Sequence, residues 1–169
     1  LEPLADIKLS DLLVYEQAGP ESGEGWVAAI RVEHAMGATL AHMEIAGPTG
    51  GNGIGICQEE GEPGQSAAGI YLLDCEDCAL QQAQMSEVVG GAGGEPVFGG
   101  CDGPGGLGGD GAGMALIDCT GTTITEFATT SIQGGSGGGK FTKPAGWGGL
   151  GAGIYLAGST YITISEGTV

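Results

Sequence analysis

The stretch GAGMALIDCTGTTITEF occupies residues 111–127, and a closely similar phrase, GAGIYLAGSTYITISEG, follows forty residues later at 151–167. Equivalent positions at Ala29, Gly69, Gly113 and Gly153 show that the phrase recurs at spacings of 40, 44 and 40 residues. Residues 7–9 repeat only its second part. Because self-similarity at such a period is typical of repeat architectures, the sequence predicts about four and a half stacked units.

Each unit alternates between two sets of side chains. Ile70 and Leu72 would point to one side of a strand and Tyr71 and Leu73 to the other, and a period of two predicts β-structure. The first set stays apolar from unit to unit, in the columns Ile30, Ile70, Met114, Ile154; Val32, Leu72, Leu116, Leu156; and Leu9, Leu40, Leu80, Ile124, Ile164. Such columns suit a solenoid, because one rung cannot bury its apolar face alone. The alternation and the glycine content disfavour helical repeats, and the long glycine tracts disfavour propeller blades.

These phrases, together with AAGIYLLDCEDCALQQAQM at 67–85, resemble the repeats of the right-handed parallel β-helix, or pectin-lyase-like, solenoid family. The resemblance implies an all-β, right-handed parallel β-helix of about five rungs, in a variant with long glycine-rich loops, with residues 1–169 forming a single domain. We expect a fragment or unit of a longer or polymeric protein, because the chain stops inside a repeated phrase. The family includes lyases, glycosidases, adhesins, phage spikes and ice binders, so the resemblance is more specific for fold than for activity.

Glycine supplies 38 of the 169 residues, and its excess lies in three insertions, at 47–69, 90–113 and 134–153. One interpretation is a set of flexible low-complexity loops. The tracts nevertheless keep register with one another, since Leu107 matches Trp147 at the 40-residue spacing. We therefore favour ordered tracts in an extended conformation with three residues per turn, lying side by side as a second layer.

Acidic residues dominate the charge, with 21 Asp and Glu against 4 Lys and Arg and a formal net charge of −17. Binding to nucleic acid needs clustered cations, and the four basic residues are scattered. The same shortage disfavours adhesion to anionic lipid, and no apolar run approaches the roughly 18 residues of a membrane span. We therefore expect neither nucleic-acid binding nor membrane insertion.

The chain has five cysteines, and the 44-residue repeat separates two pairs of them, namely Cys57 with Cys101 and Cys75 with Cys119. Neighbouring rungs lie about 4.8 Å apart, which falls within the Cα separation of a disulfide. Cys75 and Cys119 also align with Ala35 and Ser159, as expected for a buried column of small side chains. Disulfides between rungs and free buried thiols both stay open, and disulfides would indicate an extracellular compartment.

Candidate catalytic residues are few. Asp74 and Asp118 occupy equivalent positions one rung apart, where they could form the carboxylate pair of a glycosidase or cap backbone amides at a turn. His34 and His42 are the strongest general-base candidates by residue type, but no nucleophile motif accompanies either. We therefore assign no catalytic residue, and Asp74 and Asp118 stay weak candidates.

Acidic clusters at 57–63 and 74–78 offer oxygen ligands for calcium, from Glu59, Glu60, Asp74 and Asp77. Neither cluster has the spacing of an EF-hand or of a nonapeptide calcium repeat, so we expect at most a weak, solvated calcium site. No other cofactor is predicted, because the C-x-x-C of Cys75 and Cys78 lacks the second ligand pair of a zinc site.

The sequence thus predicts a non-catalytic extracellular structural module, such as a stalk, a filament subunit or a surface adhesin. The expected partners are further copies joined end to end, or a carbohydrate or other cell-surface partner that Trp26, Tyr71 and Tyr155 would contact. Two alternatives stay open. One is a carbohydrate-active β-helix enzyme or its fragment. The other is an ice-binding protein, whose threonine arrays resemble the column Thr39, Ala79, Thr123, Thr163.

Overall fold

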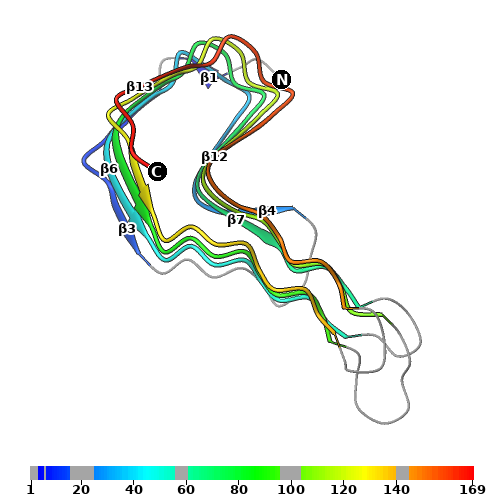
Figure 1. Ribbon diagram of the computed structural model, residues 1–169. Coiled ribbons are helices and arrows are strands. Elements are labelled where there is room, and N and C mark those ends of the chain that lie inside the picture. The colour runs from blue at the N-terminus through cyan, green and yellow to red at the C-terminus, as the bar shows by residue number, and fades with distance from the viewer. Residues whose placement is uncertain (1–3, 6, 16–24, 56–60, 96–103, 140–144) are drawn as a thin grey trace.

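The computed structural model describes residues 4–5, 7–15, 25–55, 61–95, 104–139 and 145–169. Every regular element in these ranges is a β-strand (Figure 1). The strands are β1 (Leu4–Ala5), β2 (Lys8–Ser10), β3 (Leu13–Tyr15), β4 (Trp26–Glu33), β5 (Ala35–Met36), β6 (Thr39–Ala46), β7 (Ser66–Leu73), β8 (Ala79–Ser86), β9 (Gly111–Ile117), β10 (Thr123–Thr125), β11 (Ala128–Thr130), β12 (Gly151–Ala157) and β13 (Thr163–Ser165). In this described part of the chain, no helix has the length and apolar character needed to cross a membrane.

Two parallel sheets run along the coil. One has the order β12-β9-β7-β4, and the other has the order β13-β10-β8-β6-β2, with β11 beside β8 and β3 beside β6. Leu80 pairs with Leu40 and Ile124, and Ile124 pairs with Ile164, so the predicted in-register column is confirmed. The all-β parallel solenoid is therefore confirmed, with about three turns rather than five rungs.

The inward-facing columns form one continuous core. Their middle members are almost completely buried, and the core also takes in small side chains from the corners of the coil, among them Ala35, Cys75 and Cys119. A second, smaller apolar cluster lies on the outer face of the four-stranded sheet, around Tyr71 and Ala115. The alternation seen in the sequence therefore separates two apolar faces on this sheet, rather than an apolar face from a polar one.

Left-handed backbone conformations mark the corners of every turn. They stack in four columns, which are His34, Asp74, Asp118, Gly158; Gly37, Asp77, Gly121, Tyr161; Asp11, His42, Gln82, Glu126, Glu166; and Gly47, Glu87, Ser131. The non-glycine members have φ between 50° and 56°. A single left-handed residue bends the chain and breaks the strand alternation, so the residue that follows can point inward. Cys75, Cys78 and Val88 follow such corners and are buried.

The described parts of the glycine-rich insertions are ordered, as predicted, and form a separate layer that projects from the coil (Figure 1). We call residues 47–55, 87–95 and 131–139 the outgoing tracts, residues 61–65, 104–110 and 145–150 the returning tracts, and both together the glycine layer. Hydrogen-bond donors recur every third residue, as at Gly50 and Gly53 or at Gly61 and Gly64, which fits an extended helix with three residues per turn.

Hydrogen bonds join the two rows of the glycine layer in a zigzag. The N–H of Gly91 donates to Gln65, that of Gly109 to Gly91, that of Gly135 to Gly109 and that of Gly149 to Gly135, at 2.7–2.8 Å. Each tract thus lies in the furrow between two tracts of the opposite row. This packing leaves no room for a side chain, since a Cβ on Gly109 would collide with the carbonyl of Gln65 and one on Gly135 with that of Gly91.

We predict that Gly109→Ala and Gly135→Ala each destabilise the fold by about 2–3 kcal/mol, because the new Cβ forces neighbouring backbones apart. Gly148→Ala is the matched control, since the nearest atom to its new methyl group would be the carbonyl oxygen of Gly135, at 3.3 Å. Urea unfolding followed by circular dichroism measures the difference. Equal stability of all three variants would contradict the close packing of the layer.

Candidate functional site

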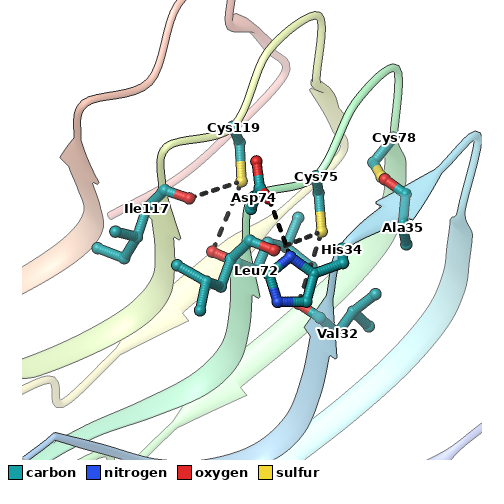
Figure 2. Close-up of polar contacts among 10 residues, drawn as sticks. Val32, His34, Ala35, Leu72, Asp74, Cys75, Cys78, Ile117 and Cys119 are labelled. Atoms are coloured by element: carbon teal, nitrogen blue, oxygen red, sulfur yellow. Dashed lines mark hydrogen bonds and ion pairs between the residues drawn. The ribbon is translucent and has the colours of Figure 1, made fainter. Parts of the chain in front are cut away.

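One corner column brings together the catalytic candidates. His34, Asp74 and Asp118 line a groove of about 620 Å³, together with Glu76 and Thr120. His34 Nδ1 lies 2.9 Å from Asp74 Oδ2, and the two side chains are shown in Figure 2. The three residues come from successive turns and share a left-handed conformation. The structure therefore confirms the stacking of Asp74 and Asp118 and adds His34 to the group.

The chemistry available at this corner is limited. The side chains of His34 and Asp74 are 57% and 65% exposed, so water solvates both. A general acid of a glycosidase usually needs an apolar pocket that keeps its carboxyl group protonated. The residues that line the groove include no Lys or Arg to hold an anionic sugar. We interpret the corner as a turn column in which polar side chains point to water.

Three thiols lie inside the coil, directly behind these corners. Cys75 Sγ donates to the carbonyls of Val32 and Leu73 at 3.5 and 3.4 Å, and Cys119 Sγ donates to those of Leu72 and Ile117 at 3.5 and 3.3 Å (Figure 2). On the next turn, the hydroxyl of Ser159 donates to the carbonyls of Leu116 and Ala157 at 3.1 and 3.2 Å. The shared pattern indicates a structural column in which a small donor satisfies two corner carbonyls.

Of the two alternatives left open for Cys75 and Cys119, the structure has the buried thiols and not the disulfide, since Cys75, Cys78 and Cys119 are all free. Equivalent Cβ atoms on in-register strands lie about 4.8 Å apart, whereas a disulfide needs about 3.5–4.5 Å. Hydrogen bonding to Cys75 and burial raise the pKa of Cys78 and of Cys119 well above the ordinary thiol value. The other expected pair, Cys57 and Cys101, lies outside the described residues.

The calcium candidates do not come together. Asp74 and Asp77 occupy different corner columns, and Glu59 and Glu60 lie outside the described residues. Within the ranges that the structure describes, no three His, Cys, Asp or Glu side chains are placed to hold a metal ion. The weak calcium site therefore stays a prediction without a defined set of ligands.

An aromatic cluster covers the outer face of the four-stranded sheet. The ring of Trp26 lies 6.1 Å from that of Tyr71 and 5.2 Å from that of Tyr155, measured between centroids. The guanidinium carbon of Arg31 lies 4.7 Å from the Tyr71 ring centroid, and Arg31 also pairs with Glu33. The three aromatic residues noted in the sequence as candidate contacts thus form one cluster.

A groove of about 450 Å³ runs between Trp26 and the returning tracts, where Pro63, Leu107, Trp147 and Asp110 line it. The 40-residue spacing predicts that Leu107 and Trp147 occupy equivalent positions on neighbouring turns. It does not predict that this pair lies beside Trp26. The signal that would have found the groove is the set of apolar residues at third positions of the returning tracts, namely Pro63, Pro104, Leu107, Trp147 and Leu150, once the tracts were taken as helices with three residues per turn.

The other outward columns carry less chemistry. The threonine column is in register as Thr39, Ala79, Thr123 and Thr163, and Ala79 interrupts it. His42 Nδ1 lies 3.7 Å from Asp11 Oδ1, and Gln82 Nε2 donates to Glu126 Oε2 at 2.7 Å. This corner column therefore holds polar side chains of different kinds on neighbouring turns.

Comparison of the chain with protein-family models, with curated proteins and with solved structures found no match. The parallel solenoid rests on the observed strand pairing, and membership of the pectin-lyase-like family stays a prediction.

The thiol column gives a direct prediction. In a chain with Cys57→Ser and Cys101→Ser, a thiol reagent at pH 7.5 should label none of the three remaining cysteines within minutes in the folded state and all three in urea. Burial inside the coil excludes the reagent from all three thiols, because none of them is more than 2% exposed. If only one cysteine were labelled in urea without reductant, the other two would be joined in a disulfide, and the prediction would be wrong.

Proposed function

We propose that this chain is a non-catalytic structural module whose copies join end to end, as a stalk, a filament subunit or a surface adhesin. The observation that carries the proposal is the state of the core columns at the two ends. Leu80, in the middle, is 1% exposed, whereas Leu9 and Ile164, at the ends of the same column, are 39% and 45% exposed. The surface that covers Leu80 is another rung, and a rung of a second copy would cover the ends in the same way.

Backbone groups at the ends support this arrangement. β2 and β13 are the outermost strands of their sheet, and an outermost strand presents N–H and C=O groups to a further strand. Gly50 and Gly90 donate to the next turn of the outgoing row, while the equivalent N–H of Gly134 has no acceptor among the described residues. The two ends differ, so the contact is head to tail, and head-to-tail contacts that do not close produce filaments.

We also propose an extracellular or cell-surface location, on the strength of the resemblance to adhesin and spike solenoids. The acidic surface supports solubility in such a setting. A carbohydrate or other cell-surface partner stays part of this proposal, with the outer face of the four-stranded sheet as its contact surface.

Self-association tests the proposal. We expect sedimentation velocity to show concentration-dependent growth and electron microscopy to show filaments. Leu9→Lys and Ile164→Lys should each weaken association at least tenfold, because a charge would be buried at the contact. Both positions are already half exposed, so the fold should tolerate the changes. Met36→Lys, on the side of the coil, is the matched control.

Two results would contradict the end-to-end contact. The first is a chain that stays monomeric up to about millimolar concentration, which corresponds to an affinity too weak for assembly. The second is association that survives when Leu9→Lys and Ile164→Lys are combined, which would place the contact elsewhere.

A carbohydrate-active enzyme is the second candidate, because Asp74, Asp118 and His34 share one groove. A screen against neutral and acidic polysaccharides, read by the release of reducing ends, tests it. We expect no turnover. Turnover that is lost in Asp74→Asn and in Asp118→Asn, but kept in Glu166→Gln at another corner column, would overturn the non-catalytic proposal.

A further inference from the structure

The two rows of the glycine layer carry different side chains. The exposed third positions of the outgoing tracts are mostly polar, and include Thr49, Asn52, Gln133 and Ser136. Those of the returning tracts include Pro63, Leu107, Trp147 and Leu150. Leu107 and Trp147 are 45% and 83% exposed. A row of exposed apolar side chains beside a groove marks an interaction surface.

The backbone donors on the returning row fall into two groups. The N–H of Asp110 donates to Ser66 Oγ at 3.1 Å, and that of Leu150 donates to Asp110 Oδ1 at 2.8 Å. Each therefore uses a side chain of the turn before it. The N–H groups of Leu107 and Trp147 have no acceptor among the described residues, because Pro63 and Leu107, in the same position one turn earlier, offer no polar side chain.

These two donors, for which the described residues offer no acceptor, belong to residues that line the 450 Å³ groove, and Trp26 bounds this groove on the side of the sheet. Inside the layer, N–H groups of successive residues donate to tracts on different sides. The groove therefore resembles an empty tract position, with donors on one wall and an indole ring on the other.

We propose that this groove binds an extended, proline-rich polypeptide segment of a partner protein, in the left-handed helix with three residues per turn. Such a segment repeats about every 9.3 Å, as do the third positions of the returning tracts, so its side chains would meet equivalent points on the wall. Its carbonyl groups would accept from Leu107 and Trp147. Its proline rings would pack on Trp26 and Trp147, as aromatic grooves pack such ligands.

Charge selects the kind of partner. The chain has a net charge of −17, and Asp110 lies in the groove itself. Arg31, which lies over the Tyr71 ring, already pairs with Glu33. The groove therefore favours a segment in which Lys or Arg flanks the prolines.

Fluorescence anisotropy with a labelled decapeptide, Lys-Pro-Pro-Gly-Pro-Pro-Gly-Pro-Pro-Lys, tests the proposal on the full chain. We expect saturable binding. Replacing every proline by alanine, or both lysines by glutamate, should weaken it at least tenfold. Neutral oligosaccharides are added as competitors, because a sugar ring would also stack on an indole.

The sharpest variant is Leu107→Pro. It removes one unpaired N–H and keeps an apolar side chain, and the backbone should accept it because Pro63 and Pro104 stand at equivalent third positions. We expect binding to weaken about tenfold, as for the loss of one hydrogen bond, with the melting temperature unchanged. Trp147→Ala should weaken binding at least tenfold as well, and Met36→Ala, outside this groove, should not change it.

Three results would overturn the proposal. They are no saturable binding of the Lys-flanked peptide up to about 1 mM, binding that is unaffected by Leu107→Pro and Trp147→Ala, and displacement of the peptide by neutral oligosaccharides at lower concentration than the peptide itself. Leu107 lies on an inner turn, with a returning tract on either side, so the outcome for Leu107→Pro is independent of end-to-end association.

Discussion

The hydrogen bonds that run from each turn to the next set one axial spacing for the whole molecule, and the rest of the structure depends on it. In the two sheets this spacing is about 4.8 Å, and side chains are free to point into the core or out to water. The tracts of the glycine layer must keep the same spacing while a second row lies in their furrows. A residue with a Cβ does not fit there, which is why the composition changes so sharply where the chain leaves the sheet.

The irregular repeat length follows from this constraint. Fourteen residues separate Thr49 from Pro63 and Gln133 from Trp147, whereas eighteen separate Val89 from Leu107. The four additional residues therefore lie between the outgoing and returning tracts of one turn, and the strands and the glycine layer stay in register on both sides of them. An insertion within a strand would shift the core columns against one another, and a shift of one residue would reverse the faces of that strand.

The sequence predicted the parts of the fold that depend on period. The column Leu40, Leu80, Ile124, Ile164 and the ordered glycine tracts follow from a two-residue and a three-residue repeat, and both are observed. A turn at Asp74 and Asp118 was among the predictions. The left-handed conformation of the corners was not predicted, because a residue such as His34 or Gln82 has no side-chain signature as clear as glycine. The sequence left the disulfide between Cys75 and Cys119 open for a related reason. Register gives the distance between Cys75 and Cys119 along the axis, but not the direction and separation of their Cβ atoms.

The candidate sites were predicted only in part. Register alone places Asp74 beside Asp118, since the two residues are equivalent members of one repeat. The contact of His34 with Asp74 needs the corner geometry, and the groove beside Trp26 needs the direction in which the glycine layer leaves the sheet. Both depend on backbone conformations at the junctions between repeats, where the pattern of the sequence is weakest.

The glycine layer also explains why stability should grow with the number of turns. Ordering glycine costs more backbone entropy than ordering any other residue, by roughly 0.5–1 kcal/mol relative to alanine. A net gain of about 1 kcal/mol per backbone hydrogen bond can offset this cost only where most N–H groups are paired. The tract at 104–110 has tracts of the returning row on both sides, whereas the tract at 145–150 has only one described neighbour in its row. A further turn stacked on an end would pair such groups and would also cover the exposed core residues there, so the layer and the core both favour stacking along the same axis.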